Sequence, residues 1–158
     1  MAHDDQQRVA RFCTLRSDVI DLFADAETEI TKYVIAHSAK PPGATQPMGQ
    51  KLELAMKVTA GPQRSKALKA KADVQLKVIQ DLLPDRAAIV HSRMSVARCV
   101  SGEYVAIFKN AKDIVHNSGN ALVFDETDLV GFLDKLRNAT SELTAVLWAK
   151  NPPPSTVK

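Results

Sequence analysis

The chain has 158 residues, a length that fits one domain able to bury about two-thirds of the surface of its unfolded form. Its 21 lysine and arginine residues exceed its 18 acidic residues by three, which favours a polyanionic partner without requiring one. The first residues, 1–7, lack the basic start and apolar stretch of a signal peptide, and no run of 18 apolar residues occurs. We therefore expect a cytoplasmic protein that neither is secreted nor binds a membrane.

The residues that most often hold metals and cofactors are scattered along the chain. Cys13 and Cys99 lie far apart in otherwise apolar surroundings, and we expect two reduced, buried thiols. The histidines that form no metal-ligand pattern with them are His3, His37, His91 and His116. The sequence has no Gly-rich phosphate loop, nucleophile elbow or dinucleotide-binding fingerprint, so we expect no metal and no cofactor.

Apolar residues spaced three and four positions apart predict a long amphipathic helix over residues 5–37. The stripe expected to face the core is Phe12, Leu15, Val19, Leu22, Ala26, Ile30 and Tyr33. The helix must end before Pro41-Pro42-Gly43, and residues 38–47 are predicted to form an exposed loop. A short helix over residues 48–60 is expected to follow.

A second long helix is predicted to begin near Ser65. Its first turns contain a basic run, residues 64–71, which is typically the solvated face of a helix and alternatively a nucleic-acid contact. Pro84 interrupts the helical pattern. Because proline suits the first turn of a helix, Pro84 either starts a new helix or kinks the existing one. The expected core stripe is Leu68, Ala72, Leu76, Ile79 and Leu83.

After His91 the period changes from helical to alternating, and residues 96–108 predict a β-hairpin that turns at Ser101-Gly102. A polar loop over residues 110–120 leads to a possible third strand at 121–124. Asp125 and the acids after it supply an N-cap and first-turn charges for a final helix. Its expected core stripe is Leu129, Phe132, Leu136, Ala139, Leu143 and Val146.

These elements predict a mainly α fold. It is a helical bundle of three long helices plus shorter ones, with a small antiparallel β-hairpin before the C-terminal helix. We expect one helical domain over residues 1–150. A Pro-rich, disordered tail is expected over residues 151–158, because Pro152-Pro153-Pro154 cannot continue a helix.

Arg86 and His91 are the residues whose pairing points most directly to chemistry. Arginine clamps a phosphate with a planar fork of donors, and histidine moves protons near neutral pH. Together they suffice for metal-free RNA cleavage, in which a 2′-hydroxyl attacks the neighbouring phosphate. His91 would act as general base or acid, and Arg86 would stabilise the developing charge.

Helix geometry complicates this pairing. Positions five apart on a regular helix differ by about 140° in direction, so Arg86 and His91 do not share a face. In a symmetric dimer, two copies of the segment meet across a two-fold axis and converge on one groove. The structural alternative is that Arg86 pairs with Asp85 or another acid, while His91 caps the helix end before Ser92-Arg93.

The segment resembles the motif of the HEPN superfamily, an arginine and a histidine separated by four to six residues at the end of a helix. Here the motif is Arg86 to His91. The apolar run 78–83 precedes it, and the 104–108 strand and the helix that starts at Asp125 follow it, an order similar to HEPN-type proteins of bacterial and phage defence loci. The resemblance implies a helical bundle that dimerises through the motif helix. In active members it implies a metal-independent endoribonuclease with Arg86 and His91 as the catalytic pair.

The sequence departs from the HEPN pattern at Ala87, where active members usually have a polar residue. Asp85, Ser92 and Arg93 are the neighbouring polar residues expected to support the site. We therefore carry two hypotheses. The first is an endoribonuclease, a toxin or antiviral effector, that cuts RNA at a dimer groove. The second is a non-catalytic HEPN-like module that dimerises, docks a protein partner or binds RNA without cutting it.

Overall fold

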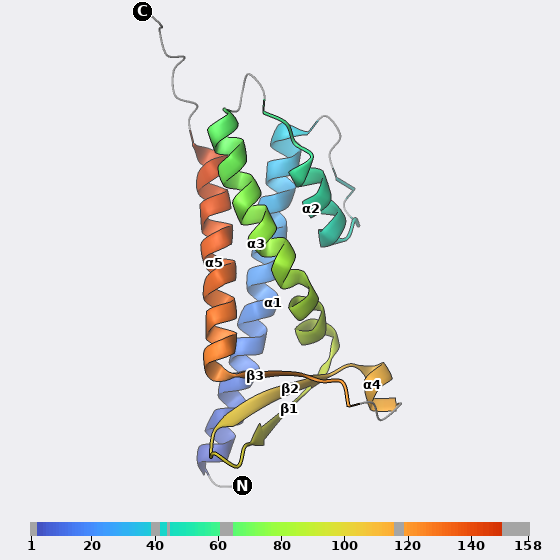
Figure 1. Ribbon diagram of the computed structural model, residues 1–158, viewed down its shortest axis with the longest axis vertical. Coiled ribbons are helices and arrows are strands. Elements are labelled where there is room, and N and C mark those ends of the chain that lie inside the picture. The colour runs from blue at the N-terminus through green and yellow to red at the C-terminus, as the bar shows by residue number, and fades with distance from the viewer. Residues whose placement is uncertain (1–2, 39–41, 44, 61–64, 116–118, 150–158) are drawn as a thin grey trace, which may run out of the picture. The chain divides into compact units, whose positions relative to one another are not determined.

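A computed structural model describes residues 3–38, 42–43, 45–60, 65–115 and 119–149, with the side chain of residue 113 excepted (Figure 1). The Pro-rich segment 151–158 lies outside these residues, as do His116 and Arg64. The elements in chain order are α1 (His3–His37), α2 (Met48–Met56), α3 (Lys66–His91), β1 (Arg93–Arg98), β2 (Tyr104–Lys109), α4 (Ala111–Val115), β3 (Leu122–Asp125) and α5 (Glu126–Trp148).

The predicted fold class is confirmed. The chain is mainly helical, and α1, α3 and α5 are its long helices. A three-stranded antiparallel sheet in the order β1-β2-β3 precedes α5, so the third strand predicted from residues 121–124 is also present. The chain divides into two compact units, and each of the long helices contributes residues to both.

Unit 1 comprises residues 1–24 and 81–136 and contains the sheet. Its core includes a chain of aromatic rings drawn from α1, the sheet and α5. Phe23 lies 5.9 Å from Phe132, Phe132 lies 6.4 Å from Phe124, and Phe124 lies 6.0 Å from Phe108, measured between ring centroids. These tilted and edge-on pairs stabilise the core beyond the simple burial of their area. Figure 1 shows the sheet beside the first turns of α1.

Unit 2 comprises residues 25–80 and 137–158 and contains α2. Lys51 on α2 is buried and pairs with Glu27 on α1 at 2.7 Å, which satisfies its charge in the interior. Lys69, from the basic run at 64–71, donates to the carbonyl of Met56 at 3.2 Å and also pairs with Asp73. This lysine therefore closes the end of α2 and is not a free cation for nucleic acid.

The predicted core stripes are largely confirmed. In α5 every predicted residue is buried, and in α1 only Leu22 departs from the prediction, being half-buried while Phe23 is buried. In α3, Leu68 and Leu83 are half-buried, while Ile89 joins the core. These small displacements reflect the 100° turn per residue of a helix, which lets a neighbouring position face the same partner.

Several element boundaries differ from the prediction, among them the start of β1, which is Arg93 where the predicted hairpin begins at residue 96. The short helix predicted over 48–60 ends at Met56, because the last turn tightens and the N–H of Val58 bonds the carbonyl of Ala55 at 3.2 Å. Val58, which follows the end of the helix, is buried. The loop predicted over 110–120 contains α4, which begins when the N–H of Ile114 bonds the carbonyl of Asn110 at 3.1 Å.

The hairpin between β1 and β2 turns where the Ser101-Gly102 pair predicted it. The N–H of Gly102 donates to the carbonyl of Cys99 at 2.9 Å, and the N–H of Cys99 donates to the carbonyl of Glu103 at 2.7 Å. Gly102 has a φ of 91°, a conformation that favours glycine. This pattern matches a type I turn followed by a bulge.

The prediction for the cysteines is half wrong. Cys13 and Cys99 are both free thiols, but both are exposed. Cys13 follows the buried Phe12 and so faces away from the core of α1, and Cys99 lies in the hairpin turn. Apolar sequence neighbours did not indicate burial, because adjacent positions of a helix lie about 100° apart and a turn projects into solvent.

Candidate functional site at the end of helix α3

Helix α3 continues through Pro84 to His91, so Pro84 starts no new helix. Proline has no N–H to bond the carbonyl of Gln80, four positions back, and the boundary between the two units falls between Gln80 and Asp81. The motif residues Arg86 and His91 therefore lie on one continuous helical stretch within unit 1.

Arg16 of α1 closes the C-terminal end of α3. Its Nε donates to the carbonyl of Ile89 at 3.1 Å, and its Nη2 donates to the carbonyls of Val90 at 3.3 Å and Ser92 at 2.9 Å. These carbonyls have no helical partner, and the guanidinium also offsets the negative end of the helix dipole. Arg16, and not His91, is the cap of this helix.

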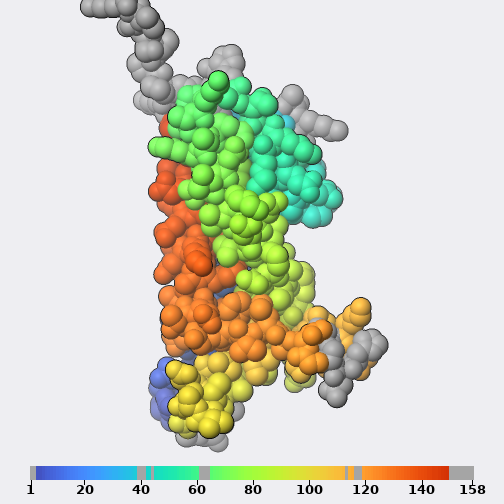
Figure 2. Space-filling model, in the orientation of Figure 1, coloured from blue at the N-terminus to red at the C-terminus, as the bar shows by residue number. Residues whose placement is uncertain are grey.

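His91 is exposed beside a cavity of about 540 Å³. Its side chain makes no hydrogen bond or ion pair with another described residue. Figure 2 shows this region, where the last turns of α3 meet the residues that lead into β3 and α4 protrudes beside them. The cavity is lined by Ala87, Ala88, His91, Ser92, Phe108, Asn110, Asn120, Ala121 and Leu122.

Arg86 lies elsewhere on α3. Its guanidinium lies over the ring of Phe23, 5.9 Å from the centroid, and it is absent from the lining of the cavity at His91. Its Nε is buried and has no hydrogen-bond partner among the described residues. Among the described residues Arg86 forms no ion pair with Asp85 or with another acid, so that structural alternative is wrong. Within one chain, Arg86 and His91 do not converge on a common cavity.

The supporting residues also separate. Asp85 lines a different cavity of about 400 Å³, together with Asp128 and Lys135 of α5. Ser92 is buried, and its N–H bonds the carbonyl of Ala88 at 3.0 Å, so it shapes the chain between α3 and β1. Arg93 is exposed at the first position of β1.

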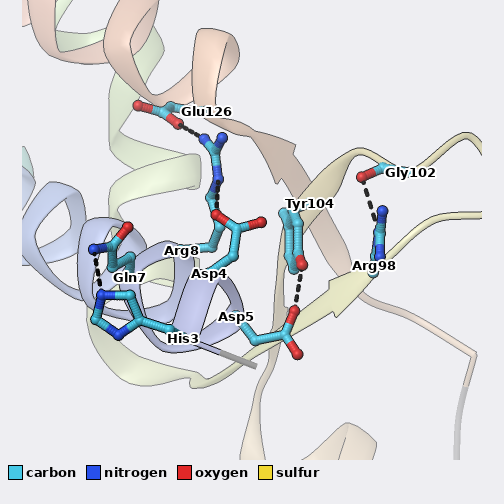
Figure 3. Close-up of polar contacts among 9 residues, drawn as sticks. All are labelled: His3, Asp4, Asp5, Gln7, Arg8, Arg98, Gly102, Tyr104 and Glu126. Carbon is cyan, nitrogen blue, oxygen red and sulfur yellow. Dashed lines mark hydrogen bonds and ion pairs between the residues drawn. The ribbon is translucent and has the colours of Figure 1, made fainter. Parts of the chain in front are cut away.

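A polar cluster ties the start of α1 to the sheet and to α5 (Figure 3). The hydroxyl of Tyr104 on β2 donates to the carboxylate of Asp5, and this hydrogen bond raises the pKa of Tyr104 above its ordinary value of 10.0. Arg8 and Arg11 pair with Glu126 at 3.5 and 2.8 Å. The cluster borders a cavity of about 360 Å³. Each of its charged side chains already has a hydrogen-bond or ion-pair partner within the cluster, so these contacts hold α1 to the sheet and to α5.

Arg16 is not among the residues predicted for the site, although the sequence carries a signal for it. Arg16 lies on the apolar stripe of α1, four positions after Phe12 and three before Val19. A charged residue on the core face of a helix requires a partner inside the protein. That signal indicates a buried contact but does not name the helix end that accepts it.

Among the residues that the structure describes, no group of three or more histidine, cysteine or acidic side chains is arranged to hold a metal ion. None of the described helices combines the length and apolar character that a bilayer span requires. Comparisons with protein-family models, with curated proteins and with solved structures found no match to this chain.

Proposed function

We propose that this chain is a metal-independent endoribonuclease of HEPN type that cuts RNA at a groove formed by two copies. The observation that carries the proposal is the state of His91. It is exposed beside a cavity at the end of a helix that Arg16 already caps, so its imidazole is not used to hold the fold together. An imidazole in that position can exchange protons with a bound strand.

The proposed reaction is a transesterification. The 2′-oxygen of a nucleotide attacks the adjacent phosphorus, and the bond from phosphorus to the 5′-oxygen of the next nucleotide breaks. His91 accepts the proton of the 2′-hydroxyl or returns a proton to the departing 5′-oxygen. The products are a strand that ends in a 2′,3′-cyclic phosphate and a strand that begins with a 5′-hydroxyl.

In this proposal, Arg86 of one copy acts together with His91 of the other copy. Because it lies about 140° round α3 from His91, one chain does not bring both to one phosphate. A two-fold axis beside the ends of two α3 helices lets the guanidinium of one copy face the imidazole of the other. Its terminal nitrogens would then stabilise the charge that develops on the phosphate. We further propose that the protein acts on RNA in the cytoplasm, as a toxin or an antiviral effector.

The test is cleavage of RNA in the presence of EDTA, with wild type compared with His91→Ala. General acid–base catalysis contributes about 10²–10⁴-fold, and we expect a loss of that size. His3→Ala is the matched control, because His3 is also exposed and hydrogen-bonds only Gln7 among the described residues. Circular dichroism confirms that both variants fold. Undiminished cleavage by His91→Ala contradicts the proposal.

One observation favours the second candidate function, a non-catalytic module that dimerises and binds RNA or a protein. Arg86 lies on Phe23 with its Nε buried, and the cavity wall beside His91 carries the side chains of Ala87 and Ala88. Both features suit a structural arginine and an unreactive groove. This candidate predicts no cleavage at any protein concentration and a dimer that survives His91→Ala. The absence of cleavage distinguishes it from the enzyme, and analytical ultracentrifugation with the same two variants tests the dimer that both candidates require.

A further inference from the structure

Arg93 and Lys109 stand directly opposite each other in the sheet. They are partners in the antiparallel register of β1 and β2, so their side chains leave the same face of the sheet. The Cβ atoms of such partners lie about 4.5–5.5 Å apart, and like charges at this spacing repel. Two cations at the open end of the hairpin, away from its turn, destabilise the sheet unless another group offsets their charge.

Among the side chains that the structure describes, no acid pairs with either cation to relieve this repulsion. The side chains of Arg93 and Lys109 form no ion pair or hydrogen bond with another described residue. On their face of the sheet the acidic residue is Asp125, which is opposite Val105, four residues along β2 from Lys109. That separation is about 13 Å at the rise of a strand. Asp125 is also engaged, because its carboxylate accepts the N–H of Asp128 at the start of α5.

The pair lies next to the cavity at His91. Arg93 follows Ser92, and Lys109 lies between Phe108 and Asn110, and all three of these neighbours line that cavity. Successive side chains of a strand point to opposite faces, so the cavity and the two cations occupy the two sides of one sheet end. A strand of nucleic acid that leaves the cavity and passes round this end of the sheet would come within reach of both cations.

We propose that Arg93 and Lys109 together bind the phosphate backbone of an RNA strand and guide it to the cavity at His91. A negatively charged phosphate between the two cations offsets the repulsion that the free protein carries. The identity of the ligand rests on the proposed function, whereas the anion site itself rests on the strand register and the absence of nearby acids among the described residues.

The experiment measures binding of a fluorescein-labelled 12-nucleotide oligouridine by fluorescence anisotropy between 50 and 300 mM NaCl. All proteins carry His91→Ala, which prevents cleavage during the titration. The variants are Arg93→Met, Lys109→Met and the double variant, and the control is Lys71→Met, an exposed lysine in unit 2. Methionine keeps the length of the side chain and removes the charge.

Each phosphate contact to a single strand contributes about 0.7 to the slope of log K against log salt. We expect each single variant to lower the slope by about 0.7 and the double variant by about 1.4, with Lys71→Met unchanged. At 0.15 M salt this corresponds to a loss of about fourfold in affinity for each contact. Slopes for Arg93→Met and Lys109→Met that equal the control overturn the proposal.

Thermal unfolding supplies a readout that a purely structural role moves in the opposite direction. Removal of one of two repelling charges is expected to leave Tm unchanged or raise it, whereas loss of a structural contact lowers it. Tm is also measured with inorganic phosphate at constant ionic strength. A phosphate-dependent rise that the double variant loses, without a change in RNA slope, assigns the pair to a small anion and overturns the RNA proposal.

The binding measurement and the cleavage assay test the two proposals separately. If the wild-type protein cuts no RNA but the slopes fall as expected, the proposed enzyme is wrong and the binding site stands. If the wild-type protein cuts RNA and the slopes do not fall, the enzyme stands and the binding site is wrong.

Discussion

Arg16 and Ser92 are 76 positions apart in the sequence, and the guanidinium of Arg16 donates to the carbonyl of Ser92 at 2.9 Å. This contact, with the two others that Arg16 makes to α3, joins the middle of α1 to the point where α3 ends and β1 begins. It determines where the motif helix stops and keeps His91 free of a capping role.

Arg16→Met is expected to lower the free energy of unfolding by about 2–3 kcal/mol. Hydrogen bonds that involve a charged group contribute about 1.5–3 kcal/mol each, but the freed carbonyls at a helix end can turn partly to water. Urea denaturation measures the change. Arg11→Met, on the same helix, removes a half-exposed ion pair with Glu126 and is expected to cost under about 1 kcal/mol. Equal losses of unfolding free energy in the two variants would show that the cap stabilises the protein no more than an exposed ion pair does.

Arg86 and Phe23 are expected to be energetically coupled. A cation over an aromatic ring within about 6 Å contributes about 0.5–2 kcal/mol, and the distance here is 5.9 Å. A double-mutant cycle with Arg86→Met and Phe23→Leu, followed by urea denaturation, should give a coupling of about 1 kcal/mol. The same cycle with Arg93→Met in place of Arg86→Met is the control and should give none. A coupling near zero for Arg86 would free this residue from a structural role.

Gly102→Ala is expected to destabilise the protein by about 1–2 kcal/mol. Gly102 has a φ of 91°, and a side chain in the left-handed region costs about that much, although space for a methyl group exists 3.7 Å from Arg98 Nη2. Denaturant unfolding measures the effect. Val100→Ala, at the exposed tip of the same turn, is the matched control and should leave stability unchanged. A neutral Gly102→Ala would mean that the turn adopts another conformation.

The Tyr104 to Asp5 hydrogen bond predicts a pH dependence of stability. The bond raises the pKa of Tyr104 in the folded protein above the 10.0 of the unfolded chain, so the folded state holds the phenolic proton more tightly. The contribution is complete below pH 10 and is lost as the pH rises through the folded pKa. Tm measured from pH 8 to pH 11 should therefore fall more steeply for wild type than for Tyr104→Phe. Parallel curves would contradict the predicted linkage.

Much of the fold could be predicted from local patterns. Spacing alone predicts the buried stripe of α5, from Leu129 to Val146, because helical periodicity is a property of consecutive residues. The hairpin was found because Gly102 supplies a conformation that few other residues adopt. The start of α5 was found because Asp125 can accept the N–H of Asp128, three positions on.

The site could be predicted only in part. The sequence singled out Arg86 and His91, but their environments depend on residues that periodicity does not connect to them. Phe23, which receives Arg86, and Arg16, which caps α3, come from a helix more than sixty positions earlier. The exposure of Cys13 and Cys99 was also missed, because apolar neighbours in sequence say little about which way one side chain points.

By itself, then, the sequence determined the helices, the hairpin and the presence of an arginine and a histidine near one helix end, since each depends on residues within a few positions. Only the tertiary structure decided that Arg16 closes that helix and that Arg93 stands opposite Lys109. The physical reason is that a hydrophobic pattern specifies which face of an element is buried, whereas the partner of that face and the strand register arise when distant segments pack together.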